Sequence, residues 1–117
     1  MNAIRGAISV EANSVEAIAH ATCTLLQEIE RRNCLRVQEI VSVFFTLTGD
    51  LNADFPARAA RSMGWDVPML DMVEIDVPGS LPSCLRVLIH VRRDGPVKHA
   101  YLGKARQLRL DLEGEAE

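Results

Sequence analysis

The architecture of this chain follows from residues 84–91, which read Cys84-Leu85-Arg86-Val87-Leu88-Ile89-His90-Val91. Their composition and two-residue alternation are typical of a β-strand. One face is purely aliphatic, whereas on the other face Arg86 lies between a thiol and a leucine. A guanidinium stays charged at any ordinary pH and is costly to bury alone, so we predict that Arg86 faces an anion. The alternative is an edge-strand arginine that reaches water and discourages aggregation.

The composition predicts a single domain over residues 1–117. Apolar residues make up 48% of the chain and aromatic residues only 4%, so the core must consist mostly of aliphatic side chains. A net charge of −3 and a pI near 5.6 argue against nucleic acid or an anionic membrane as a partner. No apolar run is long enough to span a bilayer, and the first ten residues lack a signal-peptide pattern. We therefore predict a cytoplasmic protein.

Chemical motifs that need a metal, a cofactor or a nucleophile do not occur in the sequence. Cys23, Cys34 and Cys84 are odd in number and widely spaced, and the histidines show no zinc-binding spacing. No G-x-S-x-G, P-loop or G-x-G-x-x-G motif is found. We predict no metal and no cofactor, and any reaction must proceed without an obvious nucleophile.

The apolar periodicity predicts an alternation of strands and helices. We expect a strand over residues 3–10, an amphipathic helix from a cap at Asn13 to about Asn33, and a short strand over 99–102. The nearly unbroken apolar run within 39–48 predicts a central strand buried on both faces.

The remaining segments are shorter. Proline and glycine bracket a short helix over 55–64, and residues 71–77 form an irregular extended piece. Residues 103–112 fit either a strand continuation or a helical turn, and the acidic residues 113–117 a loose tail. The fold class is α+β, with a mixed β-sheet that carries one long and one short helix on one face. Because these helices leave the other face uncovered, we predict self-association into a closed ring.

Six motifs and two dipeptides then resemble a known family over residues 3–112. They are Ile4-Arg5-Gly6-Ala7, Val10-Glu11, Phe55-Pro56-Ala57-Arg58-Ala59-Ala60-Arg61, Gly64-Trp65, Glu74-Ile75-Asp76-Val77, Cys84-Leu85-Arg86-Val87, His99-Ala100-Tyr101-Leu102 and Leu108-Arg109-Leu110-Asp111-Leu112. Their order and the twelve-residue step from Glu74 to Arg86 resemble the monofunctional, trimeric α/β-barrel-type chorismate mutases of the AroH class.

This resemblance implies the isomerisation of chorismate to prephenate, a step toward phenylalanine and tyrosine, without cofactor or metal. It also implies a homotrimer that forms a pseudo α/β-barrel, with one site in each cleft between neighbouring subunits. By resemblance, Arg86 would lie beside the ether oxygen of the substrate and Glu74 would accept a hydrogen bond from the ring hydroxyl. Arg5 and Tyr101 would bind a carboxylate and orient the side chain.

The resemblance also implies a set of substrate-binding residues. Phe55, Ala57, Arg58 and Arg61 would line the cleft from the neighbouring subunit, Arg109 would lie near its mouth, and the backbone of Leu70, Asp71, Met72 and Val73 would form the wall beside Glu74. Asp71 stands where a small or thiol residue is expected. Its side chain either faces the pocket and repels a dianion, or turns away and leaves only its backbone beside the substrate. Leu110 replaces an expected proline.

The predicted chemistry agrees with the residues present. A [3,3] rearrangement of an enol ether transfers no proton and needs no nucleophile. Because the C–O bond breaks ahead of C–C bond formation, negative charge grows on the ether oxygen, and a fixed cation stabilises it most in the transition state. Two alternatives stay open: a non-catalytic trimer that binds small carboxylates, and a reactive-imine deaminase on a similar trimeric fold.

Overall fold

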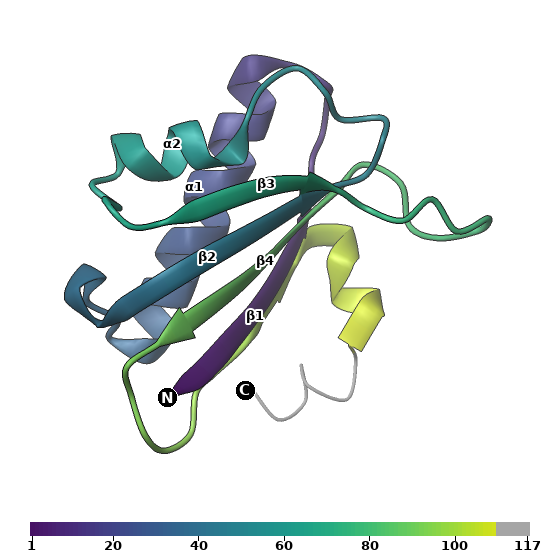
Figure 1. The fold of residues 1–117 in the computed structure, drawn as a ribbon. Helices are drawn as coiled ribbons and strands as arrows, with labels where there is room; N and C mark the ends of the chain where they lie inside the picture. The colour runs from purple at the N-terminus through teal and green to yellow at the C-terminus, as the bar shows by residue number, and fades with distance from the viewer. Residues whose placement is uncertain (110–117) are drawn as a thin grey trace.

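The structure, a computed structural model, describes residues 1–109, except for the side chain of Arg109. A mixed sheet with strand order β3-β2-β4-β1-β5 forms its centre (Figure 1). The elements are β1 (Asn2–Ser9), α1 (Val15–Asn33), η1 (Val37–Glu39), β2 (Ile40–Leu47), α2 (Pro56–Ser62), β3 (Met69–Val73), β4 (Cys84–Val91), β5 (Ala100–Leu102) and η2 (Gly103–Arg109). The predicted α+β class with a mixed sheet is confirmed.

The strand that contains Arg86 lies at the centre of this sheet. β4 pairs antiparallel with both β1 and β2, while β3 and β5 add parallel strands at the two edges. In this register Arg86 is opposite Ala7 on one side and Thr46 on the other. The edge-strand alternative for Arg86 is therefore wrong, since both edges of β4 are paired.

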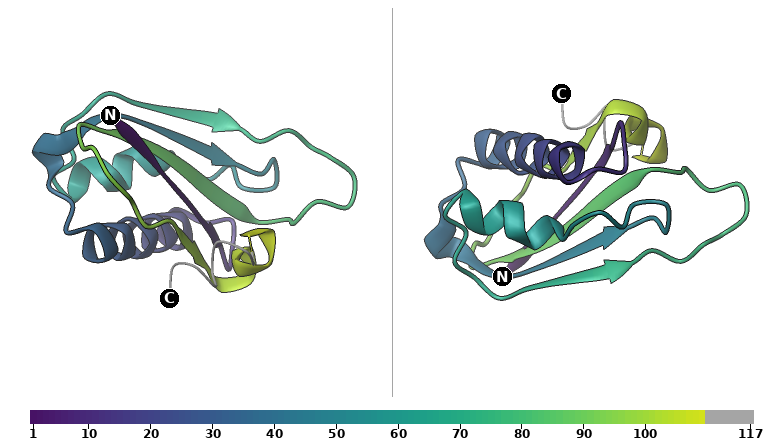
Figure 2. Two further views of the ribbon diagram at one scale, coloured as in Figure 1. Left: turned by 90° about the horizontal axis from the view of Figure 1, so that it is seen from below. Right: turned by 90° about the horizontal axis from the view of Figure 1, so that it is seen from above.

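Helices α1 and α2 both cover one face of the sheet, as predicted (Figure 2). The aliphatic face of β4, with Leu85 and Ile89 fully buried, packs into the core that α1 closes with Leu25 and Ile29. Gly6 permits the close approach of α1, because a Cβ there would lie 2.9 Å from the Ile29 side chain. The predicted alternation of β4 thus separates a buried helix-side face from an open face. None of the helices within residues 1–109 has the length and apolarity needed to cross a bilayer.

The cap of α1 differs by one residue from the prediction. Ser14, not Asn13, is the N-cap, and its Oγ accepts a hydrogen bond of 3.1 Å from Ala17 N. Asn13 instead accepts hydrogen bonds from the backbone N–H groups of Asn52 and Ala53 in the loop after β2. Two adjacent residues both suit a cap, and the tertiary contact with this loop decides between them.

The prediction that β2 is buried on both faces is wrong for the single chain. Val43 and Phe45 have no exposed surface on the helix side, whereas Phe44 and Thr46 on the other side are only half-buried. An apolar run cannot tell whether a second layer comes from the same chain or from another one.

The open face is partly covered by a segment that the sequence left undecided. Residues 103–109 form the 3₁₀-helix η2, which buries Ala105 against Ala7 and Cys84 on the open face. We expected the face of the sheet opposite the helices to be left uncovered, and this expectation is wrong where η2 packs on Ala7 and Cys84. Leu110 and the predicted tail 113–117 lie outside the described residues.

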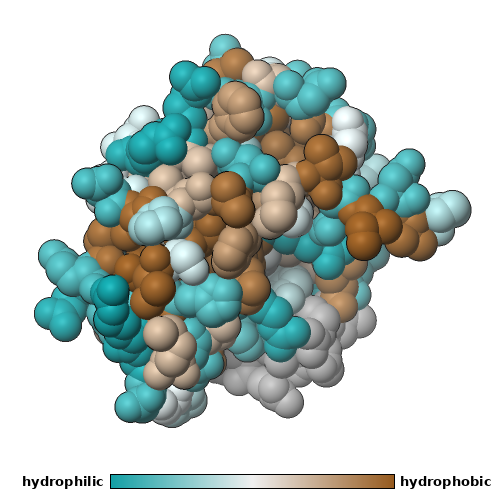
Figure 3. All heavy atoms as spheres, in the orientation of Figure 1, coloured by the Kyte–Doolittle hydropathy of each residue, from teal (hydrophilic) through white to brown (hydrophobic). Residues whose placement is uncertain are grey.

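Apolar side chains gather on the rest of the open face and on the segment that projects after β3 (Figure 3). Leu70 is 57% exposed and Val73 is 78% exposed on the edge strand β3. Ile75 and Val77 in the projecting segment are also exposed. Exposed apolar side chains that gather in this way are typical of an interaction site.

Candidate active site

Arg86 extends from the centre of β4 onto the open face. Its Nε is buried and lies 2.8 Å from Glu74 Oε1, although the side chain as a whole is 43% exposed. The two groups form an ion pair, but no residue in the described part of the chain accepts a hydrogen bond from Nε. The ion pair with Glu74 fixes the orientation of the guanidinium, and the exposed remainder of the Arg86 side chain faces the cavity.

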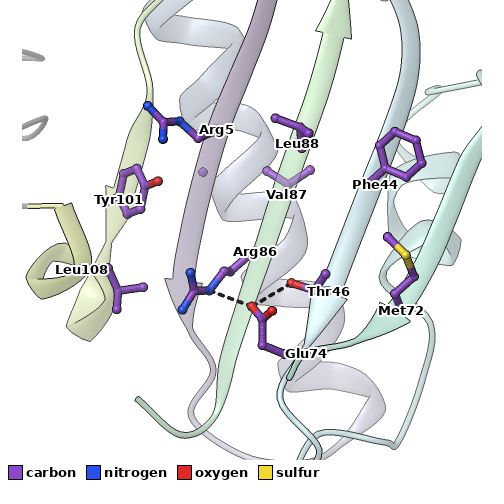
Figure 4. A pocket seen from close by; sticks show the side chains of 11 residues that line it. Arg5, Phe44, Thr46, Met72, Glu74, Arg86, Val87, Leu88, Tyr101 and Leu108 are labelled. Carbon is purple, nitrogen blue, oxygen red and sulfur yellow. Dashed lines mark hydrogen bonds and ion pairs between the residues drawn. The ribbon is translucent and has the colours of Figure 1, made fainter. Parts of the chain in front are cut away.

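Glu74 follows directly after β3 and is fixed from two sides. Its backbone N–H continues the pairing with β2 by donating to Leu47 O at 2.8 Å. The Thr46 hydroxyl donates to Glu74 Oε1 at 3.2 Å, and the Arg86 guanidinium faces the same oxygen (Figure 4). Both side chains that contact this carboxylate come from rigid strands, so its position is set before any ligand binds.

Arg5 and Tyr101 stand on the neighbouring strands, β1 and β5. Tyr101 pairs with Ala7, which places the phenol on the same open face as Arg5 and Arg86. The backbone N–H of Arg5 donates to His99 Nδ1 at 2.9 Å, which ties β1 to the segment before β5. The Arg5 side chain lies beside the Tyr101 ring (Figure 4).

These four predicted catalytic residues line one cavity of about 630 Å³, which is within the usual range for a small-molecule site. Its wall consists of Arg5, Gly6, Phe44, Thr46, Met72, Glu74, Arg86, Val87, Leu88, Tyr101 and Leu108. Two guanidinium groups and one carboxylate leave this lining with a net positive charge. Thr46 and Phe44 were missed by the sequence reasoning, although the alternation of β2 places both of them on the same open face as Arg86.

The predicted binding residues of α2 do not line this cavity within the single chain. Phe55 and Arg58, together with Asp71, Met72 and Val73, line a second cavity of about 390 Å³. Met72 contributes to both cavities.

Three further predicted residues line neither cavity: Ala57 is buried in the core, and Arg61 and Leu70 are exposed. Arg109 ends η2, and its side chain is outside the described part.

Phe55 and Arg58 form a local cluster at the start of α2. Asp54 Oδ1 accepts a hydrogen bond of 3.0 Å from Arg58 Nε, and the guanidinium lies 5.9 Å from the centroid of the Phe55 ring. Phe55 is 59% exposed. An exposed phenylalanine under an arginine offers both an apolar and a cationic contact to a ligand or a neighbouring chain.

Asp71 turns its side chain toward α2, away from the cavity of Arg86. It pairs with Phe45, which faces the helices, and its Oδ1 accepts a hydrogen bond of 3.1 Å from Ala57 N. Burial raises the pKa of this carboxyl group, while the hydrogen bond from Ala57 and the charge of Arg61 act in the opposite direction. Of the two orientations considered for Asp71, the structure has the one in which only its backbone is near the Glu74 wall.

Residues 1–109 contain no group of three or more His, Cys, Asp or Glu side chains close enough together to hold a metal ion. Cys84 is buried beside Arg86, and burial raises the pKa of its thiol although the guanidinium opposes the shift. The thiol is therefore a poor nucleophile at neutral pH.

Fold and site together define a small α+β protein with a preformed cationic cavity on an open sheet face. Residues 1–112 match the model of the family described as chorismate mutase type I. The chain belongs to this family.

Relatives and a solved structure agree with this assignment over nearly the whole chain. A chorismate mutase AroH from Thermus thermophilus is 47% identical over 94% of each chain, and one from Bacillus subtilis is 41% identical over 93% of this chain and 90% of that protein. A chorismate mutase structure from Clostridium thermocellum superposes with a TM-score of 0.89 at 46% identity, and covers 92% of this chain and 99% of that one.

Proposed function

We propose that this chain converts chorismate to prephenate in the biosynthesis of phenylalanine and tyrosine. The observation that carries the proposal is the convergence of Arg5, Glu74, Arg86 and Tyr101 on one cavity in a chain of the chorismate mutase family. We also propose a cytoplasmic location, in which the three free cysteines would stay reduced.

Arg86 is the proposed source of rate enhancement. As the ether C–O bond breaks and the new C–C bond forms, electrons move only within the substrate and no proton leaves it. The ether oxygen gains negative charge on the way, and a guanidinium held in a central strand stabilises that charge without having to reorient. The exposed part of the Arg86 side chain supports this role, because that side chain is 43% exposed and lines the cavity, so that donors not facing Glu74 can reach the substrate oxygen.

The other side chains bind and orient the substrate. Glu74, held by Thr46, accepts a hydrogen bond from the ring hydroxyl. Arg5 pairs with a carboxylate, and Tyr101 donates to it or packs beside it. The backbone of Leu70–Val73 forms the wall next to Glu74, and these contacts select the conformer in which the reacting carbons are close together.

A homotrimer with a pseudo α/β-barrel would complete each site. Its support is the exposed apolar surface of β3, Ile75 and Val77, which needs a partner, and the second cavity at α2, which shares only Met72 with the first. In this assembly Phe55, Arg58 and Arg61 of one subunit face the Arg86 cavity of its neighbour, the buried Ala57 lies beneath them in α2, and Arg109 is near the mouth. A closed ring of three buries the exposed apolar surface of every subunit in the same way.

The two alternatives are less well supported. A protein that only binds small carboxylates has no need for a carboxylate inside its cationic cavity, yet Glu74 is held there by two side chains. An imine deaminase on a similar trimeric fold would leave the match to the chorismate mutase family unexplained.

The decisive experiment is incubation of the purified chain with chorismate, without added metal. We expect the ultraviolet absorbance of chorismate to disappear far above the rate in buffer, and prephenate to appear in equal amount. Binding without loss of absorbance would instead support the carboxylate-binding alternative. Light scattering should give the mass of three chains, and a monomer would contradict the assembly.

A further inference from the structure

The start of α2 is held by a side chain from a different element. This helix has only seven residues, and its N-cap residue Phe55 has no side-chain acceptor. Pro56 has no N–H group, so Ala57 supplies the first free donor of the helix. Asp71 Oδ1, from the edge strand β3, accepts that hydrogen bond at 3.1 Å. The carboxylate thus does for α2 what a cap residue normally does from within the same helix.

We propose that Asp71 is a positioning residue that fixes α2 on β3, so that Phe55 and Arg58 are presented correctly to the active site of the neighbouring subunit. This inference rests on the proposed function and on the proposed trimer. It assigns to Asp71 an effect on the neighbour's site and not on the Glu74 wall of its own chain.

Within residues 1–109, the other hydrogen bonds at the start of α2 are local and do not connect the helix to the sheet. Asp54 accepts hydrogen bonds from Phe55 N at 2.8 Å and from Arg58 Nε at 3.0 Å. These contacts join residues next to one another in sequence, and they would move together with the helix. The hydrogen bond from Ala57 to Asp71 spans fourteen residues and connects the helix to the sheet. It therefore adds a directional link to β3 beside the cluster of Phe55 and Arg58, on a helix whose Ala57 and Ala60 pack in the core.

The cost of placing a carboxylate at this position supports a specific role. Asp71 is half-buried opposite the fully buried Phe45, in a strand whose other residues are apolar. Desolvation disfavours its charge and raises its pKa. An apolar residue would avoid this cost but would leave Ala57 N without an acceptor.

The test is made on the full-length trimer with the variants Asp71→Ala and Asp71→Asn. Asp71→Ala should lower kcat/KM about tenfold, which corresponds to the free energy of one charge-assisted hydrogen bond. The loss should come mainly from a higher KM. Asp71→Asn retains an acceptor oxygen and should recover most of that loss. The exposed Asp66 provides a matched control, and Asp66→Ala should behave as the unmodified protein does. Asp71→Ser, whose hydroxyl is too short to reach Ala57 N, replaces the alanine variant if the latter does not assemble.

Mixed trimers separate the two sites on which Asp71 could act. Chains with Asp71→Ala and chains with Arg86→Met are refolded together in equal amounts. About a quarter of the sites in a random mixture then combine an intact Arg86 from one chain with an intact α2 from the other. We expect the activity of the mixture to exceed the average of the two pure variants by about a quarter of the unmodified activity.

Two results would overturn the inference while leaving the proposed function intact. Asp71→Ala could be as active as the unmodified protein, or mixed trimers could be no more active than the average of the two pure variants. The latter result would mean that Asp71 acts on the site of its own chain. If the unmodified protein itself does not convert chorismate, the proposed function fails, and this inference fails with it.

Discussion

Replacement of Arg86 by methionine should separate catalysis from folding. Methionine keeps most of the length and the apolar stem of the side chain but removes all donors and the charge. Loss of one preorganised donor to a developing oxyanion costs about 2.7–4 kcal/mol of transition-state stabilisation. We therefore expect Arg86→Met to lower kcat at least about a hundredfold, with a smaller change in KM.

The effect of the same change on stability should be small, because two contributions oppose each other. The ion pair of Arg86 with Glu74 is 43% and 25% exposed at its two side chains, so its loss costs about 1 kcal/mol at most. Removal of the guanidinium also removes the desolvation cost of its buried Nε, which offsets part of that loss. The free energy of unfolding should thus change by no more than about 1 kcal/mol.

The assay follows chorismate absorbance, and urea unfolding is measured at one fixed protein concentration because assembly contributes to stability. Arg92, an exposed arginine just after β4, provides the control, and Arg92→Met should leave kcat near that of the unmodified protein. The reasoning is refuted if Arg86→Met retains more than about a tenth of the activity. It is also refuted if activity and stability fall together, since Arg86 would then act through the fold.

Three further predictions concern the support of the site and of the sheet. Thr46→Val removes the hydroxyl that donates to Glu74 at 3.2 Å and should lower kcat/KM about three- to tenfold, measured with chorismate at neutral pH. Gly6→Ala places a Cβ 2.9 Å from the Ile29 side chain and should lower the free energy of unfolding by about 1–3 kcal/mol, seen as a lower urea midpoint. Two arginine hydrogen bonds lower the pKa of Glu28 to about 2, so stability should fall as the pH drops from about 4.5 toward 2, and Glu28→Gln should weaken that dependence.

The faces of the strands could be predicted because side-chain direction in a strand depends only on parity. The alternation in residues 84–91 placed Arg86 on the face opposite to Leu85 and Val87, and the structure has the same arrangement. The central position of the Arg86 strand in the sheet could not be predicted in this way. Pairing on both edges depends on contacts with residues 2–9 and 40–47, which are distant in sequence.

Contacts between elements explain what the sequence reasoning missed at the site. Thr46 and Glu74 are 28 residues apart, and they meet only because β3 runs parallel to β2 in one particular register. The orientation of Asp71 depends on the same register, since a shift by one residue would turn its side chain to the open face. Capping rules look for an acceptor within the helix, and α2 takes its acceptor from β3.

The charges around the cavity connect substrate binding to assembly. Chorismate carries two carboxylates, but the described lining of the cavity holds two guanidinium groups of which Arg86 already faces Glu74. The described lining therefore offers a net charge that matches only one of the two carboxylates. On α2, Arg58 is paired with Asp54, whereas Arg61 makes no ion pair with any residue in 1–109 and is exposed. If α2 of a neighbour supplies the missing cation, the dianion is neutralised only where two chains meet. A ligand that binds only the assembled form stabilises it by mass action, so chorismate analogues should hold the trimer together.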